Sequence, residues 1–106
     1  GRLGCLALDE GGVALLNMVD LSNPELIDVM PVPGTARGLA AQGNHLYVAA
    51  GAGGLHILDI SQPDSVNLLT TFPAADEIND LTVAGGMIYA ADGNSGIAVL
   101  KSSLFK

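Results

Sequence analysis

The sequence predicts an all-β protein made of repeated antiparallel sheets, and three observations support this fold class. A pattern recurs along the 106 residues at a spacing near 42 residues. The apolar runs are short, and glycine, asparagine, aspartate, serine or proline bounds each of them, as expected for strands joined by tight turns. Glycines also interrupt every window in which a helical period begins, so no helix is expected.

The repeat is clearest between residues 39–61 and residues 81–103, which align at an offset of 42 with eight identical pairs. Among these pairs are Tyr47/Tyr89, Gly54/Gly96 and Leu58/Leu100. Residues 16–24 supply a further copy, which aligns with residues 55–63 at an offset of 39. Three copies at a nearly constant spacing indicate a repeat protein.

Each repeat is expected to form short strands separated by turns that need glycine or asparagine. The turns are predicted at residues 42–44 and 84–86, and longer hairpin loops at residues 51–54 and 92–96. The predicted strands, in chain order, are Cys5–Leu8, Leu15–Leu21, Leu26–Val32, Gly38–Ala41, Leu46–Ala50, Leu55–Ile60, Asn67–Phe72, Asp80–Ala84, Ile88–Asp92 and Ile97–Lys101.

Four strands in about 42 residues are typical of one blade of a β-propeller. The chain is therefore predicted to be an incomplete propeller of about 2.5 four-stranded antiparallel blades, since a closed ring needs about four to eight. The repeats are placed at about residues 1–34, 35–76 and 77–106. The expected partners are proteins or further propeller blades, supplied by a longer parent chain or by copies of this chain in a ring.

The repeated apolar positions are expected to be packed between the sheets. The side chains predicted to be largely buried are Tyr47, Ile57, Leu58, Tyr89, Val99 and Leu100.

Residues 55–63, with the sequence Leu-His-Ile-Leu-Asp-Ile-Ser-Gln-Pro, and residues 19–24 resemble the LVIVD repeat. Residues 46–51 and 88–93 resemble it too. LVIVD repeats occur in bacterial and archaeal propeller proteins that are often secreted or attached to the surface. The resemblance therefore implies an extracellular or cell-surface location, and it supplies no catalytic motif. The last copy departs from the pattern at Lys101-Ser102-Ser103, which suggests the end of the repeat array.

Charge and hydropathy argue against two classes of partner. Eleven acidic residues against four basic ones give a net charge of −7, and residues 38–100 contain no lysine or arginine. Nucleic-acid binding needs a basic surface to neutralise phosphates, so it is not expected. No apolar run is long enough to cross a bilayer as a helix, so membrane insertion is not expected either.

The candidate ligand-binding residues lie on the loops that join one repeat to the next. In propellers, these loops surround the mouth of the central channel. The residues selected on this basis are Arg37, Asp76, Glu77, Asn79 and Asp80. Arg37 is the only base far from the chain ends, and it either binds a ligand or pairs with a neighbouring carboxylate.

No catalytic residue, metal ligand or cofactor is predicted. His45 and His56 have no third ligand at a zinc-like spacing, and the side chain of His56 should face away from Leu55 and Ile57. The segment Asp92–Gly96 resembles a calcium loop but lacks the closing glutamate, so a hairpin turn is expected. Asp20 and Asp59 are expected to cap the turns that follow them.

These observations favour a non-enzymatic interaction or scaffold module that presents its loops on a rigid framework. The alternative is a propeller that binds a ligand or calcium, or catalyses a reaction, at a channel site made by Arg37 and the acidic loop residues. A propeller fold is compatible with both classes.

Overall fold

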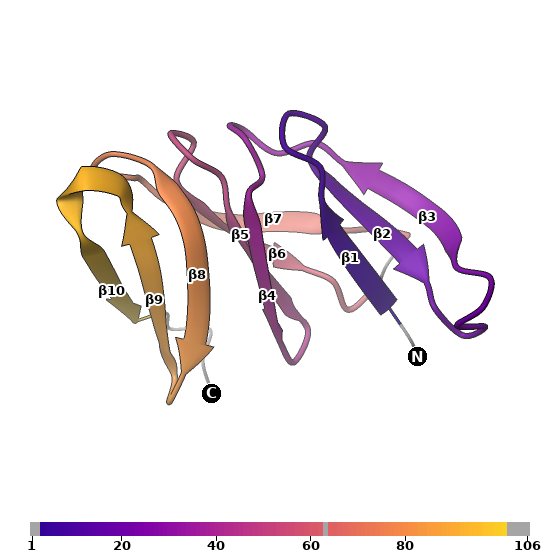
Figure 1. Ribbon diagram of the computed structural model, residues 1–106. Coiled ribbons are helices and arrows are strands. Elements are labelled where there is room, and N and C mark those ends of the chain that lie inside the picture. The colour runs from indigo at the N-terminus through magenta and orange to yellow at the C-terminus, as the bar shows by residue number, and fades with distance from the viewer. Residues whose placement is uncertain (1–2, 63, 102–106) are drawn as a thin grey trace.

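The computed structural model describes residues 3–62 and 64–101, which form three antiparallel sheets standing side by side (Figure 1). The strand orders are β1-β2-β3, β4-β5-β6-β7 and β8-β9-β10. The only helical element in the described part is a single turn, η1 (Gly93–Ser95), so the predicted all-β class is confirmed. The strands are β1 (Leu3–Ala7), β2 (Val13–Asn17), β3 (Glu25–Met30), β4 (Gly38–Gln42), β5 (His45–Ala49), β6 (Leu55–Asp59), β7 (Asn67–Phe72), β8 (Ile78–Ala84), β9 (Met87–Asp92) and β10 (Ile97–Lys101).

Nine of the ten predicted strands are present and begin and end within two residues of the predicted bounds. The predicted departure at Ser102 and Ser103 lies outside the described residues. Among the described residues, no helix is long and apolar enough to span a membrane.

The first repeat aligns with the second at a different offset from the one that the sequence suggested. The expected strand Leu15–Leu21 is wrong, because β2 occupies Val13–Asn17 and residues 18–22 form turns. In the structure β2 is equivalent to β6 at an offset of 42, not 39. The turn chemistry shows the reason: Asn17 Oδ1 accepts the N–H of Val19 at 2.9 Å, as Asp59 Oδ1 accepts the N–H of Ser61 at 2.9 Å.

Asp20 also caps a turn, but one that begins three residues after Asn17. Its Oδ1 accepts hydrogen bonds from the N–H and the hydroxyl of Ser22. The prediction that Asp20 and Asp59 cap turns is confirmed, whereas their equivalence is wrong. At Asp59 the hydrogen bonds from Ser61 favour the charged carboxylate and lower its pKa.

The sheets pack through two apolar layers, and each layer joins the forward face of one sheet to the backward face of the next. We define the forward face as the side toward later repeats and the backward face as the side toward earlier ones. Between the first and second sheets, the layer includes Val13, Leu15, Leu46, Val48 and Leu58. Between the second and third sheets it includes Tyr47, Ala49, Leu55, Ile57, Leu81, Ile88 and Ala90.

The two outermost faces are left open in the described chain. Tyr89 and Val99 lie on the forward face of the third sheet with 39% and 53% of their surface exposed, so the expectation that they are buried is wrong. Their equivalents Tyr47 and Ile57 are fully buried because the third sheet covers the second. Leu100, on the backward face, is partly buried, while Leu58 and Ile57 are fully buried as predicted.

Candidate functional site

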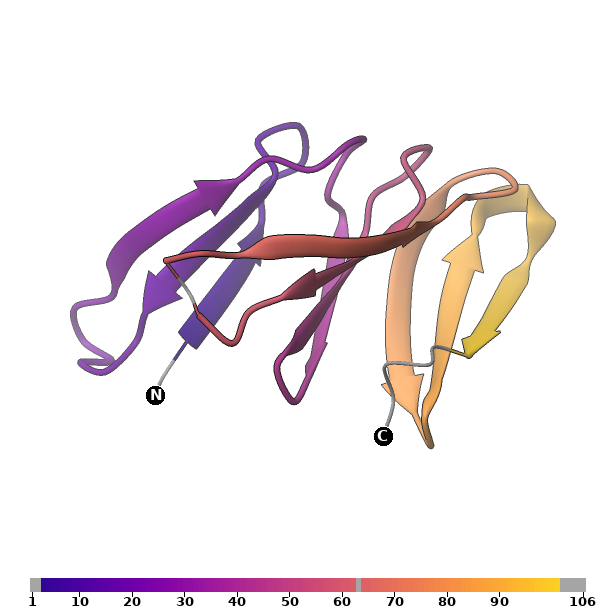
Figure 2. The ribbon, with the colours of Figure 1, turned by 180° about the vertical axis from the view of Figure 1, so that it is seen from behind.

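The loops that connect the sheets gather at one end of the stack, together with the hairpin loops before β6 and β10 (upper edge of Figures 1 and 2). Residues 31–37 join β3 to β4, and residues 73–77 join β7 to β8. The first connection is held against the loop before β6, because the N–H of Thr35 donates to the carbonyl oxygen of Ala50 at 3.1 Å. We call this region the loop end.

Three of the five predicted site residues meet at the loop end. Arg37 Nη1 donates a hydrogen bond to Asn79 Oδ1, and it lies 3.8 Å from Glu77 Oε2. Arg37 and Asn79 are equivalent at an offset of 42, so the same position in two neighbouring sheets supplies both partners. The contact therefore joins the second and third sheets, and both partners of the Arg37 guanidinium belong to the protein itself. Arg37 and Glu77 are 39% and 46% exposed, and water screens such a pair, so its contribution to stability is small.

The other two predicted residues lie elsewhere at the loop end. Asp80 Oδ1 accepts the N–H of Leu81 at 2.8 Å, and the same carboxylate stands beside Gly38 at the start of β4. Asp76 contacts the β9–β10 loop, where its Oδ2 accepts the N–H of Asn94 at 2.8 Å. The five residues therefore do not form one cluster.

Asp92 is a buried carboxylate that the sequence interpretation treated only as part of a turn. It is 5% exposed, and its two oxygens accept the N–H groups of Ala75 and Asp76 at 3.0 and 2.9 Å. The N–H of Asp92 donates to the carbonyl oxygen of Gly96, which closes the predicted hairpin loop. Asp92 thus fastens the β7–β8 connection to the β9–β10 loop. Its equivalent in the second sheet is Ala50, so the repeat pattern carries no sign of this role.

We expect Asp92→Asn to lower the free energy of unfolding by about 1–3 kcal/mol, because an amide NH₂ would face a backbone N–H within the same loop. The measurement is urea denaturation followed by circular dichroism. Asp64→Asn, at an exposed site, is the control. Equal midpoints for the two variants would show that the Asp92 hydrogen bonds do not stabilise the loop end.

His56 is the second buried polar residue, and it lies on the backward face of β6 as the strand alternation predicted. It is 1% exposed; its Nε2 lies 2.7 Å from the carbonyl oxygen of Pro33, and its Nδ1 lies 2.8 Å from Thr71 Oγ1. A carbonyl oxygen only accepts, so Nε2 carries the hydrogen, and in the neutral ring Nδ1 accepts from the Thr71 hydroxyl. His56 therefore ties β6 both to β7 and to the connection from the preceding sheet.

We expect His56→Ala to cost about 2–4 kcal/mol of stability, because it opens a cavity at a fully buried position and removes the hydrogen-bond partner of the Thr71 hydroxyl and the Pro33 carbonyl oxygen. Urea unfolding of the variant gives this value directly. His45→Ala is the matched control, since His45 is only half-buried at the start of β5. A loss no larger than that of the control would mean that His56 is not a structural link.

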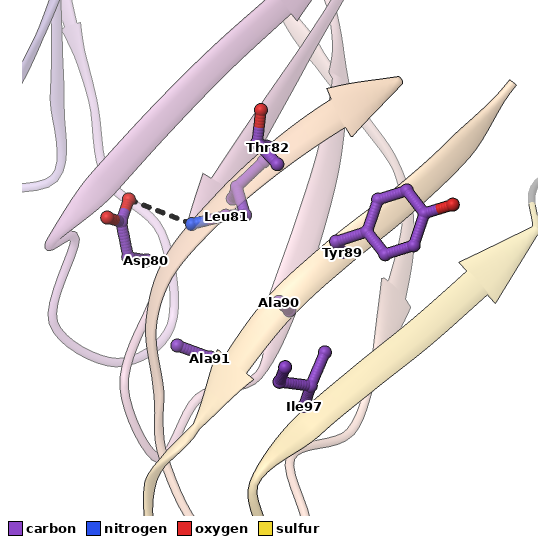
Figure 3. A pocket seen from close by; sticks show the side chains of 7 residues that line it. All are labelled: Asp80, Leu81, Thr82, Tyr89, Ala90, Ala91 and Ile97. Atoms are coloured by element: carbon purple, nitrogen blue, oxygen red, sulfur yellow. Dashed lines mark hydrogen bonds between the residues drawn. The ribbon is translucent and has the colours of Figure 1, made fainter. Parts of the chain in front are cut away.

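An open apolar concavity of about 240 Å³ lies on the forward face of the third sheet. Figure 3 shows Tyr89 and Ile97 projecting from neighbouring strands, with Ala91 near Ile97. The Asp80 carboxylate lies at one end, directed away from the Tyr89 ring (Figure 3). The lining is almost entirely apolar, which suits an aliphatic side chain from a protein partner better than a polar ligand.

No group of three His, Cys, Asp or Glu side chains in residues 3–62 and 64–101 is placed to hold a metal ion. The single cysteine, Cys5, is half-buried, and burial raises the pKa of its thiol, which disfavours the nucleophilic thiolate. The polar groups of the loop end mainly hold backbone segments in place.

Comparison with known proteins agrees with this architecture. The family model of the LVIVD repeat matches residues 33–73, which contain the whole second sheet. The solved structure titled "Crystal structure of the computationally designed Ika4 protein" is similar, with a TM-score of 0.74 and 14% identity. The alignment covers 95% of this chain and 61% of the designed one, and at this identity it shows the fold alone. No curated protein matches this chain in sequence. Residues 33–73 of this chain therefore form an LVIVD repeat, a repeat type associated with β-propeller folds.

Proposed function

We propose that the chain is a non-enzymatic interaction and scaffold module, composed of about 2.5 consecutive β-propeller blades that bind further blades through their faces. An extracellular or cell-surface location, implied by the LVIVD resemblance, is part of the proposal. The observation that carries it is the open forward face of the third sheet. This face repeats, position by position, the face that the second sheet buries.

The equivalence holds at both ends of the stack. On the forward face, Tyr89, Ile97 and Val99 are exposed where Tyr47, Leu55 and Ile57 are buried. On the backward face of the first sheet, Leu6 is 51% exposed where its equivalent Val48 is fully buried. Exposed apolar surfaces of this kind mark interaction sites.

The two open faces are of the two kinds that pack together inside the stack: one is a forward face and the other is a backward face. Each internal layer joins a forward face to a backward face, and the described chain leaves one of each. A second copy can therefore place its backward face on the forward face of the first. Such a head-to-tail contact either closes into a ring or continues as a filament.

The interactions at the loop end suit the presentation of loops to a protein partner better than catalysis. The Arg37 guanidinium is paired with Glu77 and Asn79, and the carboxylates of Asp76 and Asp92 accept backbone N–H groups. These interactions hold the loops of neighbouring sheets in a fixed arrangement. The result is an acidic, rigid surface of the kind on which a protein partner docks.

Light scattering on a sizing column, over a range of protein concentrations, tests the face contacts. We expect the wild-type chain to associate, and Ile97→Lys and Leu6→Lys each to weaken the association, because a lysine ammonium would be buried between apolar faces. Leu21→Lys is the control, since Leu21 is 63% exposed in a turn outside both faces. A chain that stays monomeric at every concentration, or association that both face variants leave unchanged, would contradict the proposal.

A further inference from the structure

We infer that the free edge of β10 binds an extended protein segment, which adds to the third sheet as a fourth, antiparallel strand. The inference deepens the proposed function and rests on it, because it names a second kind of partner contact. It depends on a strand edge, whereas the self-association above depends on sheet faces.

The position of β10 in its sheet gives the first evidence. β2 and β6, its equivalents, each pair on one side with an outer strand, β3 or β7. β10 pairs with β9, and no described residue pairs with its other edge. An unpaired edge of this kind is a ready template for strand addition.

A glycine before each of these strands gives the second evidence. Gly12, Gly54 and Gly96 are equivalent, with φ of 88°, 90° and 84°. At Gly12 and Gly54 an added Cβ would overlap the carbonyl oxygen of the last residue of the outer strand, Met30 or Phe72. At Gly96 no atom lies within 4 Å of that place, and the residue is exposed whereas Gly12 and Gly54 are buried. Gly96 thus keeps open the space that an outer-strand carbonyl fills in the other two sheets.

The two existing outer strands define the sequence that fits. Both have six residues and share one irregularity, in which the third residue, Ile27 or Leu69, is left without a direct partner. Both read polar, leucine, aliphatic, polar, β-branched and large apolar along their length. The incoming strand should therefore place its sixth residue opposite Ile97 and the carbonyl of that residue over Gly96.

Charge selects the first residue of the incoming strand. In the first two sheets this residue, Glu25 or Asn67, lies opposite Asn17 or Asp59. In the third sheet the equivalent position is Lys101, which is exposed. A glutamate opposite Lys101 gives a favourable cross-strand pair, so the partner segment should begin with an acidic residue.

The probe is an eight-residue peptide with the sequence of residues 24–31, Pro-Glu-Leu-Ile-Asp-Val-Met-Pro, carrying a fluorophore. Its binding to the full chain is followed by anisotropy at a protein concentration where light scattering finds a monomer. We expect saturable binding, with slower amide hydrogen exchange in β10. Protection confined to β1, or no binding at millimolar peptide concentration, would overturn the inference.

Gly96→Ala should weaken peptide binding by at least about tenfold, because the new Cβ would occupy the place of the peptide carbonyl. Gly86→Ala is the matched control: Gly86 also has positive φ, 77°, in the same sheet, and nothing lies within 4 Å of an added Cβ. Its peptide affinity should stay within about twofold of wild type. Equal losses in both variants would overturn the contact with Gly96.

Lys101→Glu supplies a test that does not depend on a glycine substitution. It should weaken binding of the glutamate-containing peptide and restore binding of a peptide with lysine at the same position. A change of the same sign for both peptides would overturn the assigned register.

Because the peptide leaves the sheet faces uncovered, peptide binding without self-association would refute only the face contacts. Self-association without peptide binding would refute only the edge contact.

Discussion

Leu58→Ala is expected to lower the free energy of unfolding by about 2–5 kcal/mol. Leu58 is fully buried on the backward face of β6, inside the layer that joins the first and second sheets. Removing its isopropyl end takes apolar contacts from both sheets at once. The strands around it are fixed by their ladders, so the resulting cavity closes only partly. Urea unfolding followed by circular dichroism measures the loss.

Leu16→Ala is the matched control for this prediction, because Leu16 holds the same repeat position in the first sheet. Leu16 lies on the open backward face and is only half-buried. Its truncation should cost clearly less than that of Leu58. A Leu58→Ala variant as stable as wild type would contradict the packing of the first sheet on the second.

Gly54→Ala is expected to destabilise the chain by about 3 kcal/mol or more, from two causes that add. A φ of 90° is unfavourable for alanine, and the new Cβ would overlap the Phe72 carbonyl oxygen. The chain can relieve the overlap only by moving the end of β7 away from β6. Thermal unfolding and urea unfolding both report this loss.

Gly96→Ala separates the two causes, since it keeps the positive φ and lacks the overlap. We expect it to cost only the conformational strain of about 1–2 kcal/mol. Equal losses at Gly54 and Gly96 would mean that strain alone explains the effect. The stability measurements would then give no support for an unfilled space next to Gly96 at the edge of β10.

The strands were predictable because two local signals agree along most of the chain. Short apolar runs and turn-forming glycines place β4 to β10 within two residues of the expected bounds. The same signals failed at β2, where the Asp-Leu-Ser sequence after Val19 imitates the end of a later strand. Asn17 and Asp59 cap their turns in the same way although they are different residues. A comparison of residue identities therefore could not align them.

The loop end was predictable only in part. Arg37 was expected to bind a ligand or to pair with a carboxylate, and Glu77 lies 3.8 Å from its Nη1, whereas its hydrogen bond to Asn79 was not predicted. The contact of Asp76 with the β9–β10 loop was not predicted either, because it depends on the loop that Asp92 holds in place. His56 and Asp92 act through partners 15 to 23 residues away, and no local pattern marks such partners.

The all-β class, the repeat of about 42 residues and the excess of acidic residues could be deduced from the sequence, because all three depend on local composition and period. Which of the repeated positions are buried became clear from the packing of the sheets. Tyr47 and Tyr89 hold the same repeat position between apolar residues, yet the first is fully buried and the second is 39% exposed. Burial depends on the sheet that stands in front of a residue, and the described chain supplies that sheet for Tyr47 and not for Tyr89.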